Sequence, residues 1–214
     1  SLKVLAGCAP CQPFSTHTQK EKDRETKEDW GLLYHFFELI KKVEPIVVSM
    51  ENVPQITKHK VFSDFVEGLK LLKYNVTWQN VYCPDYGIPQ NRRRLVLLAS
   101  KLGETKLIAP THKPENYKTV KMAIGNLESL KAGTSSRKDR LHKSAALSEV
   151  NLERVKKSVP GRSWRDWDEN LRADCHRKES GDTYSAVYAR MEWNKPSPTI
   201  TTQFFSFGTG RFGH

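Results

Sequence analysis

The chain has 214 residues, 37% of them hydrophobic and 28% charged, which fits one large or two small globular domains. No apolar stretch approaches the ~18 residues of a membrane-spanning helix, and the N-terminus lacks a signal-peptide pattern, so we expect a soluble cytoplasmic protein. The net charge of +11 favours a polyanionic partner, with nucleic acid as the first candidate. Four cysteines without regular spacing exclude a disulfide framework and favour a reducing compartment.

Hydrophobic periodicity predicts alternating strands and helices in the first hundred residues. The expected elements are a strand at 2–6, a helix at 32–43, a strand at 46–50, a helix at 62–72, and strands at 76–81 and 95–99. Pro45 ends the first helix because its ring cannot continue a helical turn. This order predicts an α/β fold with a mostly parallel sheet, and ligands would bind outside the carboxyl ends of its strands.

The character of the sequence changes after Ser100, where Gly, Pro, Ser, Lys and Arg become frequent and apolar periodicity weakens. We therefore place a domain boundary near residue 101. A nucleotide-binding α/β enzyme usually opens with a strand, a glycine-rich turn and a helix, but this chain begins at a strand that leads directly into a cysteine-containing loop. We interpret it as a piece of a longer protein.

The loop after the first strand contains Cys8 and Cys11, and two prolines stiffen it. A thiol held at a strand end can act as a nucleophile, so Cys11 is a candidate. The alternatives are a buried inert thiol, a redox pair with Cys8, and a zinc site. Zinc is disfavoured because only the adjacent Cys175 and His176 could supply further ligands, and Pro13 argues against the helix that a redox pair would need.

Two further segments bring polar groups to strand ends. Glu51 follows the predicted strand at 46–50, where a carboxyl group can serve as a proton donor or can be a plain solvated acid. Gln90, Arg92 and Arg94 precede the last predicted strand and would share one face if that segment were extended. That face could hold a base or a phosphate, although a charged strand edge is common.

Together these segments resemble the DNA cytosine-5 methyltransferases of bacterial restriction-modification systems. The matching motifs are PCQPFS at 10–15, ENV at 51–53, QNRRR at 90–94, and Arg190 with PTIT at 198–201. The resemblance implies a partial Rossmann-like methyltransferase sheet followed by a small irregular target-recognition domain. It assigns residues 1–100 to the C-terminal half of the catalytic domain, 101–189 to the target-recognition region and 190–214 to a return segment.

The resemblance also implies a chemistry. Cys11 would add to carbon 6 of a cytosine flipped out of duplex DNA, so that carbon 5 can accept a methyl group from S-adenosylmethionine. Glu51 would act at ring N3, and Arg94 with Arg92 would orient the base and the acid. The other residues that the resemblance places at the substrate are Pro10, Gln12, Ser15, Asn52, Gln90, Thr199 and Thr201.

A basic stretch in the second half is the main candidate for DNA contact. It runs from Arg154 to Arg165 without an acidic residue and offers Lys156, Lys157, Arg162 and Arg165 to phosphates. A solvated basic face is the alternative. The run 137–140 is a second candidate loop. Trp164 and Trp167 are expected to pack, and Cys175 and His176 are given no metal role.

The family's cofactor turn and ribose-binding acid precede its cysteine loop, so most of the S-adenosylmethionine pocket is expected upstream of Ser1, and the isolated chain is expected to be inactive. Its expected partners are duplex DNA and either the missing N-terminal segment or a cognate restriction endonuclease, with no membrane and no metal. Three alternatives stay open: an RNA cytosine-5 methyltransferase, a non-catalytic DNA-binding remnant and a thioredoxin-like oxidoreductase.

Overall fold

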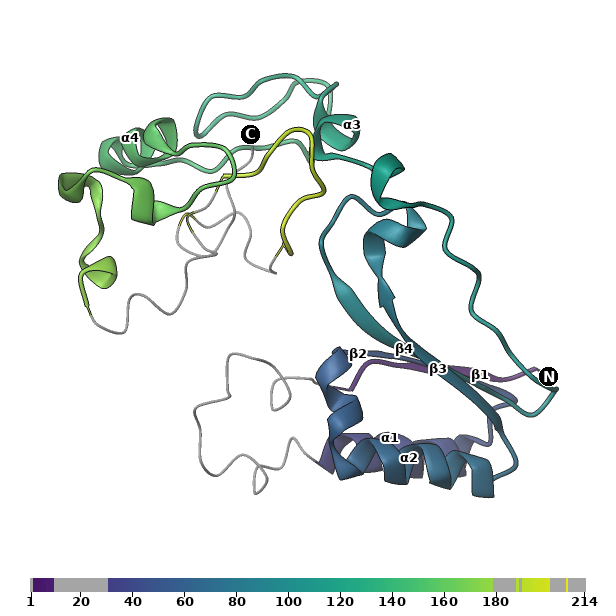
Figure 1. The fold of residues 1–214 in the computed structure, drawn as a ribbon. Coiled ribbons are helices and arrows are strands. Elements are labelled where there is room, and N and C mark those ends of the chain that lie inside the picture. The colour runs from purple at the N-terminus through teal and green to yellow at the C-terminus, as the bar shows by residue number, and fades with distance from the viewer. Residues whose placement is uncertain (1, 10–30, 179–187, 189, 201–206, 208–214) are drawn as a thin grey trace. The chain divides into compact units, whose positions relative to one another are not determined.

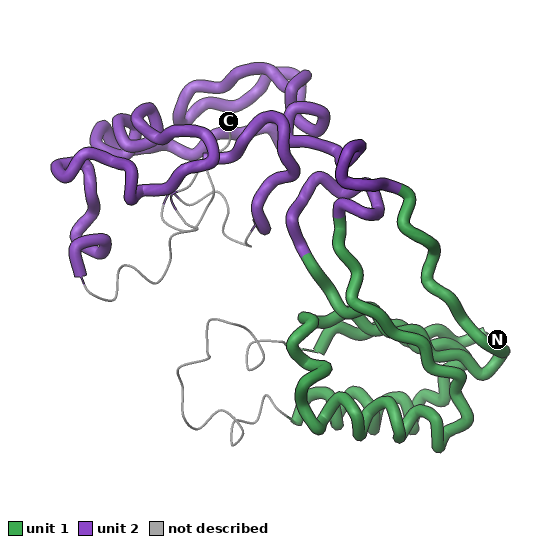
Figure 2. Tube along the Cα trace, in the orientation of Figure 1, with its two compact units in different colours: residues 1–83, 93–111 green, residues 84–92, 112–214 purple. Residues whose placement is uncertain are grey.

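The computed structural model describes residues 2–9, 31–178, 188, 190–200 and 207. The chain divides into two compact units, residues 1–83 with 93–111 and residues 84–92 with 112–214 (Figure 2). The described strands and α-helices are β1 (Val4–Gly7), α1 (Leu32–Val43), β2 (Val47–Asn52), α2 (Lys60–Leu71), β3 (Asn75–Tyr82), β4 (Arg93–Ser100), α3 (Val120–Ile124) and α4 (Glu149–Lys157).

The first unit is built on a four-stranded sheet in the order β1-β2-β4-β3. β1 is parallel to β2, whereas β4 is antiparallel to both of its neighbours. β1, β2 and β3 therefore run in one direction and β4 runs against them. The α/β class and the partial sheet are confirmed, but the mostly parallel sheet is wrong for two of the three described strand pairings. The connection from β3 to β4 spans only residues 83–92, which is too short for the helical crossover that a parallel pair requires.

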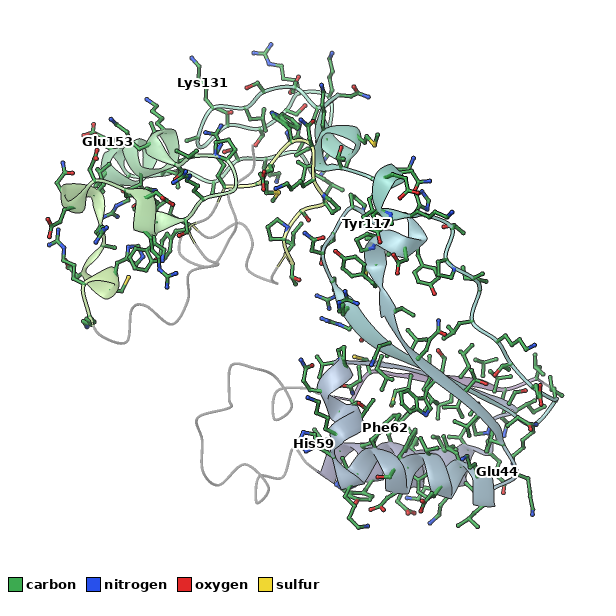
Figure 3. The ribbon with its side chains drawn as sticks, in the orientation of Figure 1. Glu44, His59, Phe62, Tyr117, Lys131 and Glu153 are labelled. Carbon is green, nitrogen blue, oxygen red and sulfur yellow. The ribbon has the colours of Figure 1, made fainter. Side chains whose placement is uncertain are left out.

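One face of this sheet carries the hydrophobic core. Leu95, Leu97 and Ala99 alternate along β4 and are completely buried. α1 and α2 lie side by side over that face (Figure 1). They approach closely because Gly68 has no side chain: a Cβ at that position would lie 2.5 Å from the Phe37 ring. Phe62 of α2, labelled in Figure 3, lies between helix and sheet, with its ring centroid 5.2 Å from that of Trp78.

The second unit consists of short elements around a small aromatic cluster. Trp164, Trp167 and Leu171 are its buried members, which confirms that the two tryptophans are packing residues. The described part of the return segment pairs with the residues that precede β4: the Asn91 amide donates to Ser197 O at 2.7 Å, and the Ser197 amide donates to Pro89 O at 2.8 Å. The roles assigned to residues 1–100, 101–189 and 190–214 stay predictions.

Candidate active site at the strand ends

A carboxylate and a guanidinium group meet where β2 ends and β4 begins. Glu51 pairs with Val96 across the two strands, so Arg94, two residues earlier in β4, lies diagonally opposite Glu51 on the same face. The Arg94 Nε atom lies 2.6 Å from Glu51 Oε1, and the Arg94 and Glu51 side chains are 21% and 41% exposed. An ion pair this open adds little stability. Its main effect is to fix the direction of a carboxylate that a ligand can still reach.

Sequence reasoning missed a third member of this group. The Cys8 thiol donates a hydrogen bond to Glu51 Oε2 at 3.0 Å, so both carboxylate oxygens of Glu51 have a partner. The parallel register explains the contact, because Gly7 of β1 pairs with Met50 of β2 and the next residues of the two strands are Cys8 and Glu51. The sequence places both Cys8 and Glu51 at the ends of predicted strands. Their contact follows only from the register of the two strands, which hydrophobic periodicity does not supply.

Asn52 connects the ends of β1 and β2. The residue is only 1% exposed. The Nδ2 group donates to Ala9 O at 3.1 Å, and Oδ1 accepts from the Val53 amide at 2.8 Å. Glu51 and Asn52 belong to β2. The sequence had instead suggested that they follow the strand. The geometry gives Asn52 a positioning role: it holds the chain leaving β1 against the end of β2. Substrate contact by Asn52 stays a prediction.

Several predicted site residues lie outside the described residues, namely Pro10, Cys11, Gln12, Ser15 and Thr201. The nearest described residue before Cys11 is Ala9, whose carbonyl oxygen Asn52 binds. The start of the cysteine loop, Cys8 and Ala9, therefore lies beside Glu51 and Asn52.

Gln90, Arg92 and Arg94 do not form one extended face, which corrects the sequence expectation. The Arg92 amide donates to Gln90 O at 2.8 Å, so the chain turns between these residues, and β4 begins only at Arg93. Gln90 forms a bridge with Ser197. Of the three predicted residues, only Arg94 has a described contact with Glu51. Their roles at a substrate stay predictions.

Some of the cations in the basic stretch from Arg154 to Arg165 contact other groups of the protein, so fewer of them are available to phosphates than the sequence suggests. Arg162 Nη1 donates to Asp166 Oδ1 at 2.9 Å, an i,i+4 pair with an acid one residue beyond the stretch. The Arg154 guanidinium is turned inward, where Nε donates to Leu171 O at 2.6 Å. The Arg165 guanidinium lies 5.7 Å from the centroid of the Trp164 ring.

Four cations of that stretch are exposed, Lys156, Lys157, Arg162 and Arg165, and the two lysines lie at the C-terminal end of α4. Glu153, labelled in Figure 3, belongs to the same helix. Thr199, in the return segment, donates its hydroxyl to Asn91 O at 2.8 Å. Contact of these residues with DNA stays a prediction.

His176 belongs to the aromatic cluster. Its ring stacks on Trp164 with centroids 4.2 Å apart and meets the Tyr188 ring edge-on at 4.7 Å. Nδ1 accepts from the Ala173 amide at 3.3 Å, while the buried Nε2 has no hydrogen-bond partner among the described residues. Burial lowers the pKa of His176, and the nearby Arg154 and Arg172 charges lower it further. The ring therefore packs in its neutral form.

None of the described helices is long and apolar enough to span a bilayer. Within the same residues, no group of three or more His, Cys, Asp or Glu side chains is placed to bind a metal ion. A pocket of about 520 Å³ in the first unit is lined by Lys70, Tyr74, Asn75, Val76, Thr77, Glu104, Thr105 and Lys106. It lies at the beginning of β3, at the opposite end of the strands from Glu51.

A partial α/β sheet with a positioned acid at its strand ends is typical of an enzyme that binds its substrate there. The chain belongs to the C-5 cytosine-specific DNA methylase family, which it matches over residues 1–208. This membership rules out the thioredoxin-like alternative.

Similar proteins agree with this family. The type II methylase M.HgiDII of Herpetosiphon aurantiacus is 50% identical over 215 residues, which cover 99% of this chain and 60% of that protein. Type II methyltransferase M1.BsuMI of Bacillus subtilis (strain 168) is 30% identical, with 99% of this chain and 48% of that protein covered. The chain therefore spans about half to three-fifths of these relatives. A crystal structure described as a prophage-encoded DNA modification methyltransferase of E. coli has the same fold, with a TM-score of 0.61 at 19% identity over 92% of this chain and 62% of that one.

Proposed function

We propose that the protein methylates carbon 5 of a cytosine flipped out of duplex DNA, through a covalent adduct with Cys11, as part of a bacterial restriction-modification system. The observation that carries this proposal is the position of Glu51. Arg94 and Cys8 hold its carboxylate at the carboxyl end of β2, beside the start of the loop that contains Cys11. Membership of the C-5 cytosine-specific DNA methylase family supports the proposal that this acid and this loop act on the same base.

In the proposed reaction the Cys11 thiolate forms a bond with carbon 6 of the base, and the electron pair of the carbon 5–carbon 6 double bond moves to carbon 5. A proton from the Glu51 carboxyl at ring N3 stabilises the electron density that builds up there. Arg94 keeps the carboxyl group aimed at the base. Once carbon 5 carries the methyl group, loss of the carbon 5 proton to a base reforms the double bond and expels the thiolate, and the proton on ring N3 returns to the Glu51 carboxylate.

The methyl group would come from S-adenosylmethionine, the methyl donor that the family implies. The described pocket does not fit it, because its lining of lysine, threonine and glutamate side chains lies at the opposite end of the strands from Glu51. Since the chain spans about half to three-fifths of its relatives, we infer that the isolated 214-residue chain does not methylate DNA alone.

DNA is proposed as the substrate because of the family and the charge of +11. Lys156 and Lys157 would contact phosphates, since both are exposed at the basic end of α4. A DNA substrate would place the protein at the nucleoid.

The test is transfer of a labelled methyl group from S-adenosylmethionine to plasmid DNA and, in parallel, to transfer RNA. The chain and a longer protein that contains it are each compared with their Cys11→Ser variants. We expect labelled DNA only with the longer protein, and none with its variant, because an alcohol does not replace a thiolate at neutral pH. Labelling of RNA alone would contradict the DNA substrate, and turnover by the Cys11→Ser variant would contradict the covalent adduct.

A further inference from the structure

The pocket of about 520 Å³ in the first unit lies at the beginning of β3, away from the candidate active site. Its volume falls in the range of small-molecule sites in proteins, about 300–1,000 Å³. Three segments form its walls: the last turn of α2, residues 74–77 at the start of β3, and residues 104–106 after β4. The reaction proposed above uses none of these residues.

Hydrogen bonds hold the walls of this pocket in place. The turn from α2 into β3 is closed by the Tyr74 amide, which donates to Leu69 O at 3.0 Å. On the other side of the pocket, Thr77 Oγ1 donates to Thr105 O at 2.8 Å and ties the segment 104–106 to β3. A ligand would therefore enter a largely preformed site and would have to order little of the chain.

Three charged side chains line the pocket without partners of their own. Lys70, Glu104 and Lys106 are exposed, and no side-chain hydrogen bond or ion pair between described residues involves any of them. Lys101 differs from these lysines because its ammonium group lies over the Tyr74 ring, 4.8 Å from the centroid. The pocket therefore offers two free positive charges and one free negative charge to a ligand.

The hydroxyl group of Thr105 is a further polar group without a partner. Its Oγ1 atom is buried and makes no hydrogen bond within the part of the chain that the structure describes. A buried hydroxyl group without a partner is unfavourable. Because Thr105 lines the pocket, a rotation about χ1 to another staggered position would let this hydroxyl donate to an acceptor there.

The C-terminal end of α2 lies beside the pocket, and a helix C-terminus ordinarily disfavours an anion. Here its last carbonyl oxygens, those of Gly68, Leu69 and Lys70, each accept a main-chain amide from the turn that follows. Lys70 also places its positive charge in the last turn of the helix. These bonds and this charge offset the effect of the helix end.

These groups favour a ligand that combines a doubly charged anionic group with hydroxyl donors. A phosphate monoester carries close to two negative charges at pH 7, which match the two lysines, and its oxygens can accept from the Thr105 hydroxyl. Glu104 repels a long polyanion such as a nucleic-acid backbone. Its carboxylate can instead accept hydrogen bonds from the hydroxyl groups of a sugar, as acidic residues do at the ribose of dinucleotides.

We propose that this pocket binds a small phosphorylated sugar, with the phosphate between Lys70 and Lys106 and the sugar hydroxyl groups at Glu104. A sugar phosphate and a nucleoside monophosphate share this chemistry, a phosphate monoester on a ring that carries hydroxyl groups. The pocket lies at the opposite end of the strands from Glu51, so binding there leaves the candidate active site free. The pocket is thus a second binding site of the protein.

The test is calorimetric titration with ribose 5-phosphate, adenosine monophosphate and adenosine. It uses the longer protein that contains this chain, saturated with S-adenosylhomocysteine so that adenosine finds no cofactor site. We expect dissociation constants below about 1 mM for the phosphates and roughly tenfold weaker binding of adenosine, which lacks the phosphate. The tighter of the two phosphates identifies the source of the ligand. Absence of binding by both phosphates, or equal binding of adenosine, would overturn the proposal.

The position of the phosphate is tested with two double variants. Lys70→Ala with Lys106→Ala should weaken the binding of ribose 5-phosphate at least roughly tenfold. The matched control, Lys42→Ala with Lys58→Ala, removes two exposed lysines of the first unit that do not line the pocket, and should leave binding within about twofold. Equal losses in the two double variants would overturn the site, as would displacement of bound ribose 5-phosphate by a short DNA duplex.

The sugar contact is tested by comparing ribose 5-phosphate with inorganic phosphate. The Glu104→Ala variant should lose most of the preference for ribose 5-phosphate, because it keeps both lysines and loses the acceptor for the hydroxyl groups. An unchanged preference in this variant would overturn the assignment of the sugar to Glu104.

The Thr105→Val variant separates ligand binding from stability. Binding of ribose 5-phosphate should weaken roughly tenfold, whereas the midpoint of thermal unfolding without ligand should not fall, since the lost hydroxyl had no partner. The control is Thr77→Val, which loses the bond to Thr105 O and should lower that midpoint. Full binding by Thr105→Val, or a fall of its midpoint equal to that of Thr77→Val, would overturn the role of the Thr105 hydroxyl.

Discussion

Replacing Asn52 by alanine should loosen the connection between the start of the cysteine loop and the end of β2. The substitution removes the hydrogen bond from Nδ2 to Ala9 O and the acceptor of the Val53 amide. Two half-buried backbone groups then lose their partners, and an unsatisfied group costs about 1–3 kcal/mol, less where water can reach it. We expect a loss of about 2–3 kcal/mol, which corresponds to a fall of roughly 4–12 °C in the midpoint of thermal unfolding.

The measurement is thermal unfolding followed by circular dichroism, with Asn80→Ala as the matched control. Asn80 is exposed in β3, so its substitution should change stability by less than about 0.5 kcal/mol. Asn52→Asp adds a second test, because a carboxylate repels Ala9 O whereas a protonated carboxyl group can donate to it. Stability of this variant relative to the parent should therefore recover as the pH falls through the pKa of the new acid. Asn52→Ala unfolding at the same temperature as Asn80→Ala would refute the positioning role.

Three further predictions concern the site acid, the aromatic cluster and α4. Cys8→Ala should lower kcat of the proposed methyl transfer and move its pH profile, since Glu51 loses the thiol bond, and Cys8→Ser should restore both; equal effects of the two variants would count against the contact. The pKa of His176 is lowered by burial, so the unfolded state binds more protons between the folded pKa and about 6.5. The contribution of His176 to the free energy of unfolding should be fully present above pH 6.5 and should fall below that pH. In urea titrations at several pH values, the His176→Phe variant should lack this dependence. Replacing Lys156 and Lys157 by alanine should reduce the salt slope of DNA binding by about 2, and an unchanged slope would exclude phosphate contact there.

Sequence patterns predicted the helices and strands better than they predicted which strands pair. Apolar spacing gave the helix at 32–43 with the bounds that α1 has, because an amphipathic period is a local property. β2, in contrast, continues past its apolar run through Glu51 and Asn52, since these polar residues still pair with Val96 and Leu95 of β4. Their strand conformation depends on a partner far along the chain, which no local window contains.

In the candidate site, too, local motifs were found from the sequence, whereas contacts that depend on the fold were missed. Glu51 and Arg94 were found from motifs, and the structure brings their side chains together. The Cys8 contact depends on strand register and was missed. The Arg162–Asp166 pair was missed because the acid stands one position beyond the stretch chosen for its lack of acids. The loop 137–140 was named from its charges, but the turn that holds it depends on hydrogen bonds of Ser136 and Asp139, which no apolar pattern signals.

The pairing of residues 89–91 with 197–199 has a consequence for protein engineering. The second unit is not one continuous piece of chain, because residues 84–92 belong to it although β4 separates them from residues 112–214. A chimera that exchanges only the segment from 112 onward would pair the return segment of one parent with the Pro89–Asn91 strip of the other. A chimera that keeps this pairing intact therefore exchanges both pieces, the nine-residue strip 84–92 together with the longer C-terminal segment.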